Sequence, residues 1–237
     1  MSKQPVNWDL VPDEFVIYDL ETTGLDAYYD EILEIGAIRF RKNDYLTSGQ
    51  IDTFQTFIKP NKPISKEITA INSITNEMVA DGTSLSQALE DFFNFSGDRH
   101  LVAFNAKFDM KFLRSAASKA EYKLPKPFKT QCALELAREK IAGLPNYKLK
   151  TLAETFHVDT TGAHRAVNDC VMTLHVYINC LNATEGLTYK GKQSRDYIPQ
   201  EIAYKSNSSV FGYLLKECFT VLGQITGLVI RSIKRKK

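Results

Sequence analysis

The sequence has 237 residues, a length that supports one full domain core and a small appendage. With 43% hydrophobic and 24% charged residues, its composition is that of a folded globular protein and excludes a disordered or fibrous chain. The net charge of +2 is nearly neutral. Charge alone therefore does not indicate a nucleic-acid binder, and such a function has to be argued from local sequence.

Strands are expected in the first part of the chain. Segments 15–20, 32–40 and 54–58 are rich in β-branched and aromatic residues and are bounded by polar or glycine-containing stretches. They predict three consecutive strands in an antiparallel meander. A helix over 85–95 and a short strand over 100–104 follow.

Helices dominate the next part of the chain. Helical patterns cover 107–119, 130–141, 148–156 and 165–182. In the last of them apolar residues recur at alternating spacings of four and three, which predicts a long helix with one core-facing stripe.

The composition changes at about residue 182, which predicts a first domain of residues 1–182. Residues 183–208 are polar and rich in turn formers, as in a linker or irregular extension. Residues 209–237 predict an amphipathic helix with a basic end, and the uncharged run 218–230 is shorter than the roughly 20 residues that span a bilayer. This helix could pack on its own domain, dock on a polymerase subunit or a second copy, or lie on an anionic membrane. Its regular stripe favours a protein partner.

A cytoplasmic location is expected from the cysteines and the N-terminus. The four cysteines include no C-x-x-C pair, which favours reduced and buried thiols: Cys132, Cys170, Cys180 and Cys218. The first residues, MSKQPVNWDLVPDEF, lack the apolar segment and cleavage site of an export signal.

The stretch FVIYDLETTGLD places two acids, Asp19 and Glu21, at the end of an apolar strand. Residues i and i+2 of a strand share a face, so the two carboxylates lie side by side and repel unless a cation lies between them. An ordinary solvent-facing strand end would also explain a bare D-x-E. The apolar run before Asp19 favours a buried strand instead, and Thr22, Thr23 and Gly24 add a turn with backbone N–H groups free to meet a ligand.

Two later segments also place acids at helix starts. In HLVAFNAKFDMKFL, Asp109 lies in the first turn of a helix, where complementing the helix dipole is the simpler explanation. In TTGAHRAVNDCVMTL, His164 begins the long helix and Asp169 lies inside it. A helix N-terminus favours the neutral imidazole and hence a base, although a single loop histidine is often incidental.

Taken together, DLETTG, FNAKFD and HRAVND resemble the three motifs of the DEDDh family of 3'-to-5' exonucleases, in the right order. The resemblance covers roughly residues 13–181. It is strongest to the epsilon subunit of bacterial DNA polymerase III and to the exonuclease domain of Gram-positive replicative polymerases. It implies a ribonuclease H-like α/β fold, a mixed five-stranded sheet flanked by helices.

The resemblance also implies a metal-dependent enzyme that hydrolyses phosphodiester bonds at the 3' end of DNA and releases nucleoside monophosphates, in proofreading or repair. It makes Asp19, Glu21, Asp109 and Asp169 the metal-binding acids and His164 the general base. Two Mg²⁺ ions, for which Mn²⁺ can substitute, suit such oxygen ligands and would neutralise charge at the scissile phosphate. The imidazole can take a proton from the attacking water.

By analogy with the family, the last nucleotide lies against Thr23, Leu25, Asn72 and Phe104. Phe104 departs from the family's usual histidine, Asn72 and Ser73 replace a usual Thr-Gly pair, and Cys132 replaces a frequent aspartate. Candidate phosphate contacts near the motifs are Lys107, Lys111, Lys148, Lys150 and Arg165. The expected partner is the 3' end of single-stranded DNA, because stacking and backbone contacts tolerate any base sequence.

Two alternatives stay open. The same chemistry would serve a 3'-to-5' exoribonuclease that trims RNA, and only contacts to the 2'-hydroxyl would separate the two. A non-catalytic interaction subunit would be expected to lack at least one of the five catalytic groups, and this sequence contains all of them.

Overall fold

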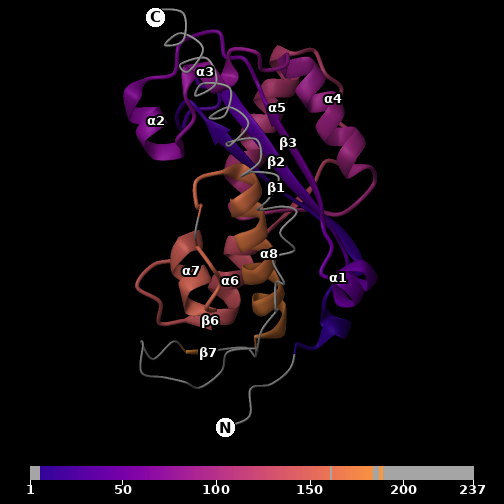
Figure 1. Cartoon of the computed structure of the whole chain (residues 1–237). Coiled ribbons are helices and arrows are strands. Elements are labelled where there is room, and N and C mark those ends of the chain that lie inside the picture. The colour runs from indigo at the N-terminus through magenta and orange to yellow at the C-terminus, as the bar shows by residue number, and fades with distance from the viewer. Residues whose placement is uncertain (1–5, 161, 184–186, 189–237) are drawn as a thin grey trace, which may run out of the picture. The chain divides into compact units, whose positions relative to one another are not determined.

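The computed structural model describes residues 6–160, 162–183 and 187–188. These residues form a five-stranded mixed sheet with helices on both faces (Figure 1), which confirms the predicted ribonuclease H-like α/β architecture. The predicted C-terminal helix and nearly all of the predicted linker lie outside the described residues. None of the described helices is both long enough and apolar enough to cross a membrane.

The sheet has the strand order β3-β2-β1-β4-β5. Its strands are β1 (Glu14–Thr22), β2 (Ile32–Arg41), β3 (Asp52–Phe57), β4 (Leu101–Ala103) and β5 (Thr130–Cys132). The first three strands pair antiparallel, as the sequence predicts, while β4 pairs parallel to β1 and β5 pairs parallel to β4.

Strand β5 corrects one expectation. The pattern over 130–141 predicts a continuous helix, but residues 130–132 pair with β4 and the helix begins only at Ala133. Three residues have too little local pattern to specify a strand, so pairing with the exposed edge of β4 decides their conformation.

The described helices are α1 (Lys42–Ser48), α2 (Lys66–Asn72), α3 (Asn76–Val79), α4 (Leu85–Ser96), α5 (Ala106–Lys119), α6 (Ala133–Lys140), α7 (Leu149–Thr155) and α8 (Ala166–Asn182), with a short 3-10 helix at Trp8–Leu10. The predicted helices at 85–95, 107–119, 148–156 and 165–182 correspond to α4, α5, α7 and α8. The short helices α1, α2 and α3 were not predicted, and side chains cap the starts of α2 and α3. Their N-cap residues, Ser65 and Thr75, accept hydrogen bonds from backbone N–H groups of the first turn and so stabilise the helix starts. A small parallel pair, β6 (Ile141–Ala142) and β7 (Leu187–Thr188), lies apart from the main sheet.

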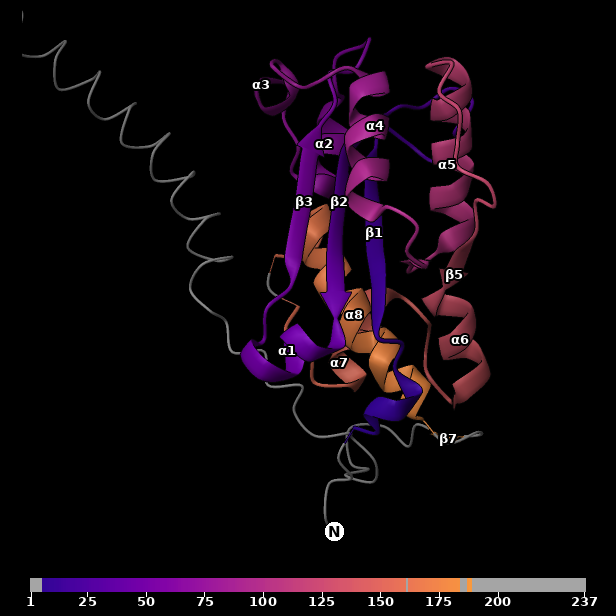
Figure 2. The same ribbon diagram turned by 90° about the vertical axis from the view of Figure 1, so that its right-hand side faces the viewer.

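The two faces of β1 pack against different helices (Figure 2). Val16, Tyr18 and Leu20 belong to the hydrophobic core formed with α4 and α5. The alternate residues face α8, where Phe15 contacts Tyr177 with ring centroids 5.4 Å apart. Because residues 15, 17, 19 and 21 share this face, the acids of β1 point to the α8 side of the sheet.

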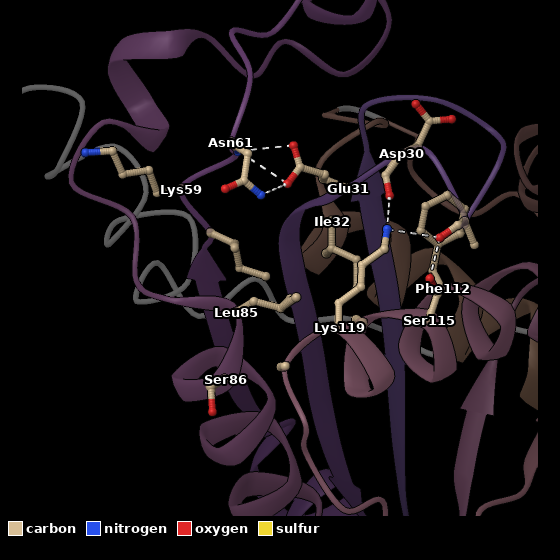
Figure 3. A pocket seen from close by; sticks show the side chains of 14 residues that line it. Asp30, Glu31, Ile32, Lys59, Asn61, Leu85, Ser86, Phe112, Ser115 and Lys119 are labelled. Carbon is tan, nitrogen blue, oxygen red and sulfur yellow. Dashed lines mark hydrogen bonds between the residues drawn. The ribbon is translucent and has the colours of Figure 1, made fainter.

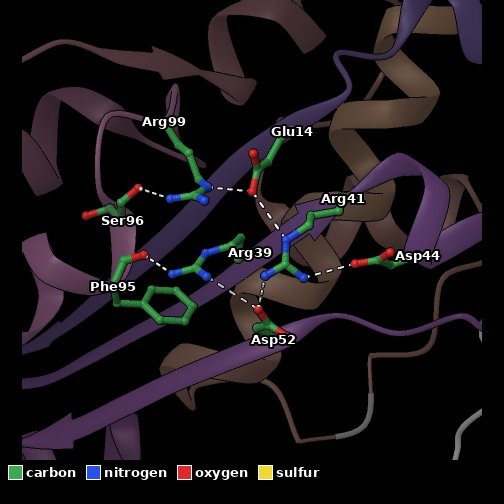
Figure 4. Close-up of polar contacts among 8 residues, drawn as sticks. All are labelled: Glu14, Arg39, Arg41, Asp44, Asp52, Phe95, Ser96 and Arg99. Atoms are coloured by element: carbon green, nitrogen blue, oxygen red, sulfur yellow. Dashed lines mark hydrogen bonds and ion pairs between the residues drawn. The ribbon is translucent and has the colours of Figure 1, made fainter.

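Charged side chains join the strands at the end of the sheet remote from these acids (Figure 4). The guanidinium group of Arg41 lies 2.5 Å from Oδ2 of Asp52 and 3.3 Å from Oε1 of Glu14. The same Oε1 of Glu14 accepts a hydrogen bond of 2.5 Å from Nε of Arg99. Such partly exposed ion pairs each contribute little to stability, but together they support the register of β1, β2 and β3.

Candidate active site

Asp19 and Glu21, the two acids of the first motif, lie two residues apart near the end of β1, so their side chains point to the same face of the sheet. Asp19 is opposite Gly36 of β2 and Glu21 is opposite Glu34, and the register shifts between Glu21 and Thr22. This shift ends the regular pairing of β1 with β2 directly after Glu21, so both acids lie near one end of the sheet.

Gly36 brings helix α8 against the sheet beside Asp19. A Cβ atom at Gly36 would lie 2.5 Å from Cβ of Ala166 and 2.6 Å from the backbone N of Val167, which no real packing tolerates. The thiol of Cys170 lies 3.4 Å from the carbonyl oxygen of Gly36. The absence of a side chain at Gly36 therefore allows the first turn of α8 to contact β2 directly.

The third motif is organised by the start of α8. Arg165 is the N-cap residue and Asp169 lies in the first turn. Oδ1 of Asp169 accepts a hydrogen bond of 3.1 Å from the backbone N–H of His164. His164 is exposed and has a φ of 68°, a left-handed conformation that histidine adopts more readily than most residues. Asp169 thus holds the backbone of the residue that the sequence predicts as the base.

Three carboxylates converge at this place. One ligand atom each from Asp19, Glu21 and Asp169 lies within 4.8 Å of the others. Asp109, the predicted fourth acid, is buried in the first turn of α5 and lies outside this group of three. Its charge nevertheless raises the pKa of Asp19, so the structure brings all four predicted acids into one electrostatic cluster.

Burial raises the pKa of every acid in the cluster, and repulsion by neighbouring acids adds to the rise for Asp19, Glu21 and Asp169. Desolvation raises the pKa of Glu21 to about 8, with Asp169 as the next contributor. Desolvation also raises the pKa of Asp109 to about 7 and that of Asp169 to about 6, although hydrogen bonds from backbone N–H groups oppose the rise in both. The pKa of Asp19 is raised well above its usual range, first by burial and then by Asp109. A cation at the cluster would remove this repulsion.

The cluster fits a divalent metal ion on the chemistry of its donors. All of its side chains offer hard oxygen atoms, the ligands that Mg²⁺ and Mn²⁺ prefer. Next to them lies Glu34, whose side chain is 0% exposed and whose Oε2 has no hydrogen-bond partner among the described residues. Arg165, which pairs with Glu34, supplies only one positive charge to these carboxylates, and the remaining excess of negative charge is costly without a further cation.

These pKa values predict how metal-free protein responds to pH. A raised carboxyl pKa means that the folded state binds protons more tightly than the unfolded state. Stability therefore falls as pH rises from about 4 through the folded pKa values, which include about 8 for Glu21. We expect saturating Mg²⁺ to raise the melting temperature by about 5 °C more at pH 8.5 than at pH 6.5, at about 2–4 °C per kcal/mol.

Scanning calorimetry with Mg²⁺ or EDTA at both pH values checks this expectation. His175 does not interfere, because burial lowers its pKa to about 4, so that this residue reduces stability only as pH falls below about 6.5. If Mg²⁺ raises the melting temperature by the same amount at the two pH values, the carboxylates are not the groups whose charge the metal neutralises.

Comparison with known proteins identifies the family. Residues 16–177 match the family described as Exonuclease, which spans all three motifs. The chain belongs to the exonuclease family. This confirms the predicted enzyme class, and the exonuclease is a homologue of DNA polymerase III proteins.

Two relatives and one solved structure illustrate the similarity. The exonuclease is 39% identical over 177 residues to the PolC-type DNA polymerase III of Caldanaerobacter subterraneus, covering 75% of this chain but only 12% of that protein. It is 33% identical over 177 residues to the DNA polymerase III subunit epsilon of Aquifex aeolicus, covering 73% of this chain and 83% of that subunit. Exonuclease X in complex with 5' overhanging duplex DNA superposes with a TM-score of 0.52 at 28% identity, covering 71% of this chain and 91% of that one.

The four predicted substrate-binding residues of the exonuclease have different environments. Leu25 is 84% exposed, whereas the hydroxyl of Thr23 is engaged with Asp30 at 3.2 Å. Asn72 is buried, and its Oδ1 accepts a hydrogen bond of 3.1 Å from the backbone N–H of Ile74. Phe104 is half-buried against the apolar cluster between α6, α7 and α8. Contacts of these residues with a nucleotide stay predictions.

The predicted phosphate contacts also differ in availability. Lys148 and Lys150 are exposed near the start of α7. Lys107 lies 3.3 Å from Glu135 and Lys111 lies 3.8 Å from Asp26, and both lysines remain well exposed. Arg165 instead pairs with Glu34 at 3.4 Å, so its guanidinium group is already engaged with protein.

Glu34 is the site residue that sequence reasoning missed. Its Oε1 accepts hydrogen bonds from Gln55 and from Arg165, whose guanidinium carbon lies 5.5 Å from the centre of the Phe57 ring. This buried group joins β2, β3 and the start of α8 next to Glu21. A signal existed, because a glutamate inside the apolar run ILEIGAI contradicts a simple buried strand.

Proposed function

We propose that this exonuclease is a divalent-metal-dependent 3'-to-5' exodeoxyribonuclease that acts in proofreading or repair, in the cytoplasm. The observation that carries the proposal is the convergence of Asp19, Glu21 and Asp169 within 4.8 Å at the end of β1. A DNA substrate is favoured over RNA because the relatives with the sequence similarity described above are DNA polymerase III proteins. The chain spans only 12% of the PolC-type relative, so nothing of its polymerase activity is carried over.

The proposed chemistry assigns each group a role. Asp19, Glu21, Asp109 and Asp169 would hold two Mg²⁺ ions, which when bound supply charge neutralisation at the scissile phosphate and a lowered pKa for the attacking water. The exposed imidazole of His164 accepts the proton of that water. Asp169 positions His164 through the hydrogen bond to its backbone N–H.

The test is digestion of 5'-labelled oligonucleotides of identical sequence in DNA and RNA form, with paired and mismatched 3' ends. We expect stepwise shortening of DNA from the 3' end, release of mononucleotides, support by Mg²⁺ or Mn²⁺ and arrest by EDTA. Faster cleavage of RNA than of DNA would instead assign the exoribonuclease function. Shortening that persists in EDTA would refute the metal-dependent mechanism.

His164→Asn is expected to lower kcat by about 10²–10⁴-fold, the usual contribution of a general base. Asparagine tolerates the left-handed backbone at this position, so the change removes the imidazole without adding strain. The Mg²⁺ concentration that gives half-maximal activity should stay within about twofold, because no predicted metal ligand is altered.

His157→Asn is the matched control. His157 is also exposed and also left-handed, with a φ of 55°, and it lies just after α7, outside the three motifs. Wild-type kcat is expected for this variant. If His164→Asn changes the Mg²⁺ requirement as much as kcat, the imidazole acts on metal binding and the base role is wrong.

For the C-terminal part of the chain we propose docking to a protein partner, a polymerase subunit or a second copy. Deleting residues 209–237 is expected to leave cleavage of short single strands within about twofold, because the predicted catalytic groups all precede residue 182. Sedimentation should show a change of association state, or loss of capture of a polymerase subunit. A truncated protein that is unfolded or inactive would show that this segment belongs to the catalytic domain.

A further inference from the structure

The connection between β1 and β2 displays an unusual amount of apolar surface. Leu25 is 84% exposed, Tyr28 74% and Tyr29 77%, which makes three of the six exposed large hydrophobic side chains in the described part of the chain. The rings of Tyr28 and Tyr29 pack edge to face, with centroids 4.8 Å apart and an interplanar angle of 83°. Side chains gathered in this way on one connection indicate a contact surface.

The connection is internally braced. The carboxylate of Asp30 accepts hydrogen bonds from the backbone N–H of Asp26 at 2.8 Å and from the Thr23 hydroxyl at 3.2 Å. Oδ1 of Asp26 accepts another, of 3.0 Å, from the backbone N–H of Tyr28. Gly24 leaves the space that the Asp30 carboxylate occupies, since a Cβ atom there would lie 2.4 Å from it. The tyrosines are therefore presented by an ordered backbone.

Two side chains of helix α5, Ser115 and Lys119, contact the backbone of the connection (Figure 3). The Ser115 hydroxyl donates to the carbonyl oxygen of Ala27. Nζ of Lys119 lies 3.3 Å from the same carbonyl and 3.2 Å from that of Asp30. A cavity of about 270 Å³ lies beneath, between the connection, α4 and α5. These polar contacts, together with the burial of Ala27 in the hydrophobic core, set the position of the tyrosine pair.

Helix α5 also gives the spacing between the tyrosine pair and the carboxylate cluster. Ser115 and Lys119 follow Asp109 along α5, and at 1.5 Å per residue they lie about 9 and 15 Å further along the helix axis. A stacked nucleic-acid strand advances about 3.4 Å per nucleotide. Ser115 and Lys119 contact the backbone on either side of the tyrosines, so a strand that follows α5 with its 3' end at the acids would pass the tyrosines about three to four nucleotides upstream.

We propose that Tyr28 and Tyr29 form a stacking site for the bases of single-stranded DNA upstream of the 3' end. The inference rests on the proposed function and names a contact of its substrate. Aromatic faces combined with nearby cations are the usual means of binding single strands without sequence preference. Lys111, exposed on α5 and 3.8 Å from the carboxylate of Asp26, supplies a cation for the backbone between the acids and the tyrosines.

The experiment compares oligo-dT substrates of two and twelve nucleotides with wild-type protein and the double variant Tyr28→Ala/Tyr29→Ala. We expect KM for the twelve-nucleotide substrate to rise about tenfold or more, the effect of losing one stacked base. KM for the dinucleotide and kcat for both substrates should stay within about twofold. Because both tyrosines are exposed, the double variant is expected to fold.

Two further variants isolate the aromatic faces. Tyr28→Phe/Tyr29→Phe keeps the rings and is expected to retain wild-type KM, which excludes a role of the hydroxyl groups. Leu46→Ala removes a 51% exposed apolar side chain on α1, at the other end of β2, and is expected to change nothing. Equal KM for wild-type protein and the double alanine variant on the long substrate would overturn the proposal.

Failure of this inference can be separated from failure of the proposed function. Fluorescence anisotropy of labelled dT12 in EDTA measures binding without cleavage, so the tyrosines are tested even if the protein hydrolyses no DNA. A loss of binding of about tenfold in the double alanine variant supports the stacking site. Unchanged anisotropy together with a changed sedimentation coefficient would assign the tyrosines to a protein interface and refute it.

Discussion

Asp19→Asn is expected to lower kcat by at least about a thousandfold and, at the same time, to make the metal-free protein more stable. The loss of kcat is expected because metal binding at the carboxylates supplies several kcal/mol of transition-state stabilisation. Each 1.36 kcal/mol of lost stabilisation lowers the rate tenfold. The gain in stability is expected because burial and neighbouring acids disfavour the charged carboxylate, which raises the pKa of Asp19 well above its usual range. A neutral amide of the same shape removes this destabilising charge. Steady-state kinetics and calorimetry in EDTA at pH 8 measure both effects.

Asp98→Asn provides the matched control. Asp98 is an exposed aspartate in the turn between α4 and β4, and its change to asparagine should alter neither rate nor stability measurably. For Asp19→Asn we expect the melting temperature in EDTA to rise by about 3 °C or more, at about 2–4 °C per kcal/mol. A variant that is inactive and also less stable would mean that Asp19 supports the fold rather than a metal site.

Gly36→Ala is expected to reduce kcat by about a hundredfold without removing any chemical group. The added methyl would lie 2.5 Å from Cβ of Ala166, so the first turn of α8 has to move away from β2. Asp169 and the backbone of His164 move with it, and a displacement of about 1 Å at a reacting group costs on the order of 10²-fold. Overpacking should also lower the free energy of unfolding by about 1–3 kcal/mol.

Gly49→Ala separates the effect on activity from the effect on stability. Gly49 has a φ of 72° and nothing within 4 Å of an added Cβ atom, so alanine there adds backbone strain but no clash. We expect this variant to be less stable, yet to keep wild-type kcat per folded molecule. A Gly36→Ala protein with normal kcat would show that α8 is not placed by this contact.

Much of the site was predictable from local sequence. An acid pair at alternate positions of an apolar strand has to share a face, whatever the rest of the fold, and the order of the three motifs predicted the family that the comparison confirms. The meander and the long helix were predictable for the same reason, since period-2 and period-3.6 patterns over many residues reflect backbone geometry. The α8 prediction began one residue before the observed start at Ala166.

Other features depend on contacts between segments far apart in the chain. Residues 130–132 became a strand because the edge of β4 offers unpaired backbone groups, a property that no local pattern contains. The roles of Gly36 and Glu34 follow from the β1–β2 register, which places them opposite Asp19 and Glu21.

The sequence by itself identified the side chains that are proposed to carry the chemistry, because the strand and helix periods that expose them are local. Only the tertiary structure decided that Asp169 and Asp19 meet, since that needs a glycine on β2 and a helix from the end of the domain to pack against it. It also decided the raised pKa values, from about 6 for Asp169 to about 8 for Glu21, because desolvation and repulsion arise only when the chain has folded.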